Sequence, residues 1–171
     1  MKVLPSFSDQ RTFGADVWNL IAFPGEPVVL TFDRRVTRQD AYESPAWMAS
    51  AACRIQFTAS RLIVEPRPIV ATDPLGPLPS RSSESEQFGR RYRIRTEDPL
   101  FATAFLDQRM LAWILDQRDG MTYEVGGGWA MVSHHDLGDP ARLDESVDLL
   151  RRFCARIPPV ASSMRSTHIT P

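Results

Sequence analysis

Two short apolar segments with a turn between them constrain the fold of this sequence most. Residues Val17 to Phe23 and Val28 to Phe32 are rich in β-branched and aromatic side chains, and Pro24-Gly25-Glu26 separates them. Such side chains favour strands, whereas proline and glycine favour turns. The arrangement predicts a β-hairpin, whose two strands run antiparallel.

Three further segments predict strands. Trp47 to Thr58 ends in a period-two alternation of polar and apolar residues, and Arg61 to Glu65 is a short strand that Pro66 ends. Phe88 to Arg95 alternates throughout, which is typical of a strand with one buried face. The segment Ala71 to Glu86 is rich in proline and serine, and we expect a mobile loop there.

The second half of the chain predicts two helices and a second pair of strands. Asp98-Pro99 and Asp139-Pro140 each combine a capping aspartate with a proline suited to a first helical turn. The first helix should run towards Gln117, and Pro158-Pro159 should end the second. Two short strands, Thr122 to Val125 and Trp129 to Ser133, should flank a turn. That turn consists of Gly126-Gly127-Gly128.

Together these elements predict an α+β fold. We expect a single domain over residues 1–160 and a disordered C-terminal tail over residues 161–171. The domain should contain a mainly antiparallel sheet of about five to seven strands, with two principal helices packed on one face.

Composition limits the classes of function. The chain has 171 residues, of which 43% are hydrophobic and 24% are charged, and its net charge of -1 argues against a dedicated nucleic-acid binder. Its apolar stretches are all shorter than the ~20 residues of a membrane helix, so we expect no integral membrane segment. Cys53 and Cys154 lack the spacing of a zinc or redox motif, which favours a reduced, cytoplasmic protein with both thiols buried.

Three arginines form the most distinctive charge pattern. Alternation along the strand expected at Phe88 to Arg95 would place Arg91, Arg93 and Arg95 on one face. Guanidinium groups in such a stripe are suited to phosphate, carboxylate or an acidic partner. The alternative is a solvated face, paired with neighbouring acidic residues. We take the three arginines as candidate partner-binding residues.

The densest group of chemically active side chains is His134-His135-Asp136, at the end of an expected strand. Adjacent strand residues point to opposite faces, so His134 and His135 are poorly placed to bind one metal ion. We therefore expect no metal site and no cofactor. The alternatives are polar loop residues, or the rim of a pocket in which a histidine acts as a general base.

Part of the chain resembles a family of uncharacterised actinobacterial domains. Their strand has the form F-x-R-R-(F or Y)-x-V and precedes a helix that opens D-P-x-F-A. The matching residues here are Phe88-Gly89-Arg90-Arg91-Tyr92-Arg93-Ile94 and Asp98-Pro99-Leu100-Phe101-Ala102. The resemblance covers roughly the second half of the chain and implies no established activity. Members often carry membrane helices ahead of the domain, a feature from which this sequence departs.

Two functions remain open. The first is a non-catalytic accessory or regulatory module that binds a protein partner through the arginines and the proline-rich loop, and that is compatible with a homo-oligomer. The second is a small-molecule-binding protein or small hydrolase with a pocket at His134, His135 and Asp136. A weaker alternative, binding of the arginines to anionic lipid or nucleic acid, would show as a steep loss of binding with salt.

Overall fold

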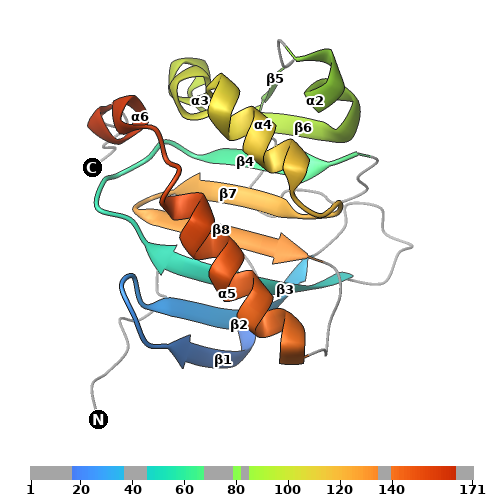
Figure 1. The fold of residues 1–171 in the computed structure, drawn as a ribbon, viewed down its shortest axis with the longest axis vertical. Helices are drawn as coiled ribbons and strands as arrows, with labels where there is room; N and C mark the ends of the chain where they lie inside the picture. Colours follow the sequence, from blue (N-terminus) through green and yellow to red (C-terminus); the bar gives the residue numbers. More distant parts are fainter. Residues whose placement is uncertain (1–16, 37–45, 68–78, 82–84, 135–139, 165–171) are drawn as a thin grey trace.

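The computed structural model describes residues 17–36, 46–67, 79–81, 85–134 and 140–164, and Figure 1 shows their arrangement. Eight strands form one sheet in the order β1-β2-β3-β8-β7-β4-β6-β5, with every neighbouring pair antiparallel. The strands are β1 (Val17–Phe23), β2 (Val29–Val36), β3 (Ala46–Arg54), β4 (Leu62–Pro66), β5 (Ser80–Arg81), β6 (Tyr92–Thr96), β7 (Thr122–Gly126) and β8 (Trp129–His134). The expected α+β fold with a mainly antiparallel sheet is confirmed.

Five helices occur in the described residues, in place of the two principal helices that we expected. They are α2 (Glu86–Arg91), α3 (Pro99–Phe105), α4 (Gln108–Asp116), α5 (Pro140–Cys154) and α6 (Pro159–Ser163). The final expected helix corresponds to α5, which crosses the central strands in Figure 1. None of the described helices combines the length and the apolarity needed to cross a bilayer.

Both expected hairpins form, and each follows from local sequence. β1 pairs with β2 around the turn at Pro24-Gly25-Glu26. β7 pairs with β8 around Gly127 and Gly128, whose φ angles of 56° and 83° lie in the left-handed region that favours glycine. The β7–β8 hairpin then lies between β3 and β4, so it joins the N-terminal strands to the rest of the sheet.

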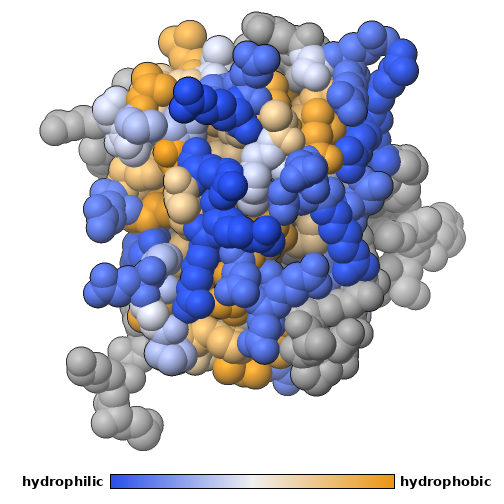
Figure 2. Space-filling view, in the orientation of Figure 1, coloured by the Kyte–Doolittle hydropathy of each residue, from blue (hydrophilic) through white to orange (hydrophobic). Residues whose placement is uncertain are grey.

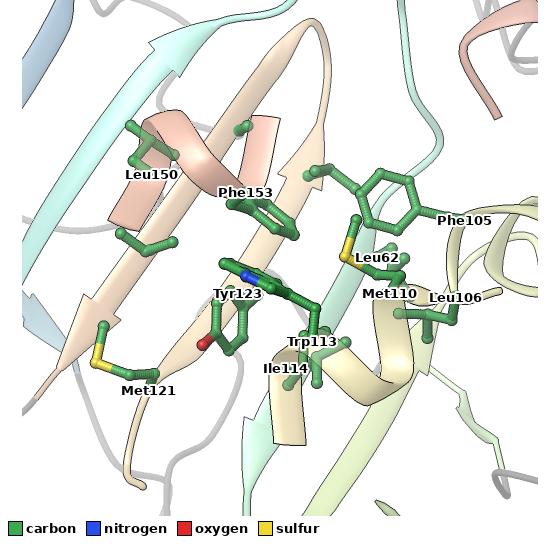
Figure 3. Packing of buried hydrophobic residues seen from close by; sticks show 14 of the residues in the cluster. Leu62, Phe105, Leu106, Met110, Trp113, Ile114, Met121, Tyr123, Leu150 and Phe153 are labelled. Carbon is green, nitrogen blue, oxygen red and sulfur yellow. The ribbon is translucent and has the colours of Figure 1, made fainter. Parts of the chain in front are cut away.

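The main core lies between one face of the sheet and the helices. Tyr123 and Val125 of β7 share one buried cluster with residues from all five helices, including Phe153 of α5 and Trp113 of α4. Figure 3 shows Phe153 among the rings of Phe105, Trp113 and Tyr123, whose centroids lie 5.8, 6.0 and 5.3 Å from its own. α5 therefore anchors the helical layer to the middle of the sheet.

The strand expected at Phe88 to Arg95 is wrong for its first half, because Phe88 to Arg91 belong to helix α2. The Ser85 Oγ accepts a hydrogen bond from the Phe88 N–H at 3.3 Å and so caps the helix. Strand β6 begins only at Tyr92. Phe88 and Tyr92 are four residues apart, and this spacing satisfies a helical period as well as an alternating one. Their rings pack with centroids 5.1 Å apart.

The helix expected from Pro99 to Gln117 is broken into α3 and α4. Asp98 caps α3 as expected, and Leu106 then leaves the helical conformation, with φ -92° and ψ 54°. The Asp107 carboxylate accepts a hydrogen bond from the Met110 N–H at 2.8 Å and starts α4. Aspartate competes with continued helix by capping a new one, and this local effect explains the break.

Two boundaries differ from those expected. β3 ends at Arg54, and residues 55–58 lie outside the strand, although the Ile55 N–H still bonds to the Gly128 carbonyl at 3.0 Å. Helix α6 occupies residues at the start of the segment expected as a disordered tail, and its Ala161 is fully buried. Of the mobile loop expected at Ala71 to Glu86, residues 71–78 and 82–84 lie outside the described residues, as do residues 165–171.

Candidate functional site

The three candidate arginines do not form one stripe. Arg91 is the last residue of α2, whereas Arg93 and Arg95 belong to β6. Within β6 the alternation holds, because Tyr92 and Ile94 enter the core while Arg93 and Arg95 point to the other face. The premise of a continuous strand of alternating arginines is therefore wrong for Arg91.

Arg91 is held by the end of α4 and by the turn that follows it. Its Nη1 donates a hydrogen bond to the Leu115 carbonyl at 2.8 Å, and its Nη2 pairs with the Asp119 carboxylate. The hydrogen bond to Asp119 raises the pKa of Arg91 above its ordinary value. About a third of the Arg91 side chain is exposed, so this arginine retains an accessible part.

Arg93 and Arg95 share one buried carboxylate, and we call these three residues the Glu65 cluster. The Arg93 Nε donates to the Glu65 Oε1 at 2.7 Å, and the Arg95 Nη1 lies 3.8 Å from the same oxygen. Glu65 and Arg95 are buried, while a third of the Arg93 side chain is exposed. One buried carboxylate thus offsets part of the charge predicted for the stripe, and Asp119 at the surface pairs with Arg91.

A second buried carboxylate lies on the same face of the sheet, and we call Glu124, Arg34 and Arg61 the Glu124 cluster. The Glu124 oxygens lie 3.6 Å from the Arg34 Nη1 and 3.2 Å from the Arg61 Nε. In both clusters one glutamate sits between two arginines, an arrangement typical of a structural network.

Sequence analysis missed Glu65 and Glu124, the acidic members of these clusters. Each stands in a short apolar strand, Leu62–Pro66 or Thr122–Gly126. A glutamate in such a strand is a signal for a buried ion pair, because an acidic side chain is seldom buried without a partner. The arginine that fills this role is fixed by strand pairing, as in the register of Glu65 with Arg93.

His134 lies in a pocket between β8 and α5. The pocket opens to solvent, and its empty space of about 370 Å³ includes that open part; it is lined by Gln117, Arg118, Met121, His134, Glu145, Ser146, Leu149 and Arg152. His134 and Ser146 are buried, and the His134 Nε2 lies 3.1 Å from the Ser146 Oγ. His135 and Asp136, the other candidates at this site, lie outside the described residues.

This pocket brings a histidine and a serine together, a combination that sequence order alone did not identify. A histidine nitrogen in contact with a hydroxyl can act as a base towards it, and the two pocket arginines are suited to an anionic group. Within the described residues, no three His, Cys, Asp or Glu side chains come together in a way that could hold a metal ion.

A third surface was not singled out in the sequence, and it is the apolar strand at one edge of the sheet. We call it the β1 surface, and its large exposed side chains are Val17, Trp18, Leu20, Ile21 and the adjoining Val28. Trp18 is 56% exposed and Ile21 is 47% exposed. Figure 2 shows hydrophobic surface at the lower end of the molecule, where Figure 1 places β1.

Comparison with known proteins identifies a fold relative but no family. No family model matches the chain, and no curated protein does. Among solved structures, the chain is similar to the crystal structure of the mycobacterial trehalose monomycolate transport factor A, TtfA. The two share 13% sequence identity with a TM-score of 0.59, over 89% of this chain and 93% of that chain. Likeness at this level of identity shows a common fold.

Proposed function

We propose that this protein is a non-catalytic accessory module that acts by binding a protein partner through the β1 surface. The partner supplies an extended, uncharged apolar segment that lies along β1. The observation that carries the proposal is the exposure of this strand: six of its seven residues are exposed, and none of the seven is charged. Soluble proteins seldom leave such a strand at a sheet edge unless it has a binding role.

Among the described residues, β1 pairs with another strand on one side alone. β1 is the first strand in the sheet order and pairs with β2 on its inner side. The register shifts between Trp18 and Ile21, where Asn19 has a φ of 53°. This bulge divides the edge into two short runs, of which Ile21–Phe23 is the longer. We therefore expect the backbone of a partner strand to pair along Ile21–Phe23, with side chains of the partner in contact with Trp18.

Trp18 provides a rigid anchor within this surface. Its ring lies 6.1 Å from the ring of Trp47, in an edge-to-face arrangement with an interplanar angle of 68°. A tryptophan fixed in this way loses little side-chain freedom on binding, and tryptophan is enriched among residues that dominate binding energy. An apolar partner segment suits this anchor better than an acidic one.

The fold likeness agrees with this proposal in a coarse sense. The similar structure is that of a transport factor, which supports an accessory role for a chain of the same fold. Our proposal places the protein in the cytoplasm, with no nucleic acid as partner. Self-association remains a separate outcome that the experiment below distinguishes.

Arg91, Arg93 and Arg95 stay candidates for a second contact with the partner. Arg91 and Arg93 each expose about a third of the side chain, whereas Arg95 is buried and would act by positioning Glu65. Replacing Arg91 alone by serine tests this contact without disturbing the Glu65 cluster. A partner affinity that does not change in Arg91→Ser would remove Arg91 from the binding surface.

The β1 proposal can be tested by photo-crosslinking followed by binding measurements. A benzophenone amino acid is placed at Leu20 in the full chain, with a matched control at Leu100, which lies on α3 and is 74% exposed. A partner crosslinked from Leu20 is identified by mass spectrometry and purified. We then measure its affinity for wild type, Ile21→Asp and Leu100→Asp.

We expect Ile21→Asp to weaken binding at least about tenfold, because a carboxylate would be desolvated in an apolar contact. Leu100→Asp should bind as wild type does. The proposal is wrong if Leu20 crosslinks no more than Leu100, or if the purified partner binds Ile21→Asp as tightly as wild type. It is also wrong if the crosslinked species is a second copy of this chain, since the occupant would then be the protein itself.

The His134 pocket supports a second candidate function, a small-molecule-binding protein or small hydrolase. The observation that favours it is the 3.1 Å contact between the His134 Nε2 and the Ser146 Oγ. In an acyl-transfer reaction the serine oxygen would attack an ester carbonyl and its proton would pass to the histidine nitrogen. Ser146 stands inside helix α5 and is 4% exposed, so a substrate has little access to its oxygen.

A serine-reactive fluorophosphonate probe distinguishes the two functions. A nucleophilic Ser146 would be labelled, and both Ser146→Ala and His134→Ala would abolish the label. Our leading proposal requires that the wild-type protein remain unlabelled. Labelling of Ser146 would support the hydrolase function of the His134 pocket in place of our leading proposal.

A further inference from the structure

The only two cysteines of the chain meet where α5 lies on the sheet. Cys53 lies on β3 and Cys154 is the last residue of α5, 101 positions later in the chain. Their Sγ atoms are 3.4 Å apart, and both residues are free thiols. A disulfide bond is about 2.05 Å long, so the sulfurs must approach by roughly 1.4 Å to form one.

The surroundings of the two thiols differ. Cys53 is fully buried in the main core, where its register partners are Val29 and Ala130. Cys154 is half-buried and packs against the same core from α5. A small oxidant can therefore approach from the Cys154 side, while Cys53 is held in a fixed position.

Contact between the thiols also prepares one of them for reaction. With the S–H of Cys154 as the donor in this contact, the hydrogen bond to the Cys53 sulfur and the positive charge of Arg151 lower the pKa of Cys53. The same contact raises the pKa of Cys154, because Cys154 keeps the proton that it donates. A thiolate next to a thiol is the arrangement from which disulfides form.

We propose that Cys53 and Cys154 are a redox modification site, at which an oxidant of the peroxide class forms a disulfide between β3 and α5. The proposal does not depend on the function of the β1 surface or of the His134 pocket. It goes beyond the expectation of two buried thiols: Cys53 is buried and Cys154 is half-buried.

The reaction balances with hydrogen peroxide as the oxidant. Peroxide transfers one oxygen to the first sulfur, which becomes a sulfenic acid, and one water is released. The second sulfur then attacks the sulfenic sulfur, and its proton leaves with the hydroxyl group as a second water. Two thiols and one peroxide thus give one disulfide and two waters.

The disulfide would fasten α5 to the middle of the sheet. α5 packs on β2, β3 and β8, and one turn before its end the Arg151 Nη2 bonds to the Pro24 carbonyl at 2.9 Å. A bond between Cys53 and Cys154 would close a long loop and would restrict the unfolded chain. The oxidised protein should therefore resist separation of α5 from the sheet better than the reduced protein does.

The test is peroxide titration of the full chain, followed by intact mass and thermal unfolding. We expect the wild type to lose two hydrogen atoms and both free thiols, and its Tm to rise by about 10 °C. Dithiothreitol should reverse both changes.

Two single substitutions serve as controls. Cys154→Ser suits the half-buried position, and Cys53→Ala avoids placing a hydroxyl in the core. Neither variant should lose two hydrogen atoms or show a rise in Tm.

Three results would overturn the proposal. One is a wild-type mass that gains oxygen atoms without losing two hydrogens. Another is a disulfide found only between two copies of the chain. The third is an intramolecular disulfide that leaves the Tm unchanged, because the bond would then not fasten α5. The reduced variants are compared with reduced wild type by circular dichroism, so that a folding defect is not taken for loss of the disulfide.

Discussion

Replacing Glu65 by glutamine removes the negative charge that Arg93 and Arg95 share and keeps the size of the side chain. Glu65 is 5% exposed, and its Oε1 lies 2.5 Å from the Arg93 Nη2 and 3.8 Å from the Arg95 Nη1. Breaking a buried ion pair costs about 3–5 kcal/mol, because the remaining charge stays buried without its counterion. Water reaches part of Arg93, so we expect Glu65→Gln to lower the free energy of unfolding by about 2–4 kcal/mol.

Urea titration, followed by circular dichroism, measures this loss without adding salt that would screen the charges. The matched control is Glu86→Gln. Glu86 pairs with Arg90 at 2.5 Å on the surface of α2, where both side chains are largely exposed. We expect no measurable change in the control, because water already solvates both partners.

A Glu65→Gln variant within about 0.5 kcal/mol of wild type would refute this reasoning. It would show that the two arginines need no buried carboxylate for the stability of the fold. A loss of the expected size would assign the Glu65 cluster to stability, leaving Arg91 and the exposed part of Arg93 for binding.

Three other substitutions or titrations test the core, a helix cap and a pair of buried phenols. Phe153→Ala should lower the free energy of unfolding in urea by about 3–5 kcal/mol, because it removes a fully buried ring, whereas the exposed Leu100→Ala should leave it unchanged. Asp107→Ala should cost about 1 kcal/mol by removing the cap of α4, and Asp107→Asn should recover most of that loss. Burial raises the pKa of Tyr123 and of Tyr92 above the ordinary value of 10.0, so the folded state holds both phenol protons more tightly than the unfolded state does. The stability from these protons is complete below about pH 10 and is lost as pH rises above it, and ultraviolet absorbance should show the phenols ionising together with unfolding. Ionisation of both phenols below pH 10 in a folded protein would contradict this.

Local signals in the sequence predict much of the fold. The hairpins β1–β2 and β7–β8 follow from apolar strands that flank turn residues, and α5 follows from a proline start and an apolar face. The order of the strands has no comparable signal. β3 pairs with β8, although Ser50 lies 83 positions before its partner Ser133 in the sequence.

The candidate sites show the same division between local and distant information. Arg93 and Arg95 are correctly placed on one face of a strand, but their partner Glu65 lies 28 residues before Arg93. His134 is predicted at the end of a strand, while Ser146 reaches it only because α5 folds back onto β8. Side chains that meet through tertiary packing cannot be paired by spacing along the chain.

The place of the β7–β8 hairpin in the sheet determines when this protein can complete its fold during synthesis. β3 can pair on its second side only after β8 has left the ribosome, because β8 lies between β3 and β7 in the sheet. Until residue His134 has left the ribosome, the three N-terminal strands form a meander whose inner edge is as open as β1. The nascent chain therefore exposes two open edges while residues 55–134 are being synthesised, and this is the interval in which wrong strand pairing competes with folding.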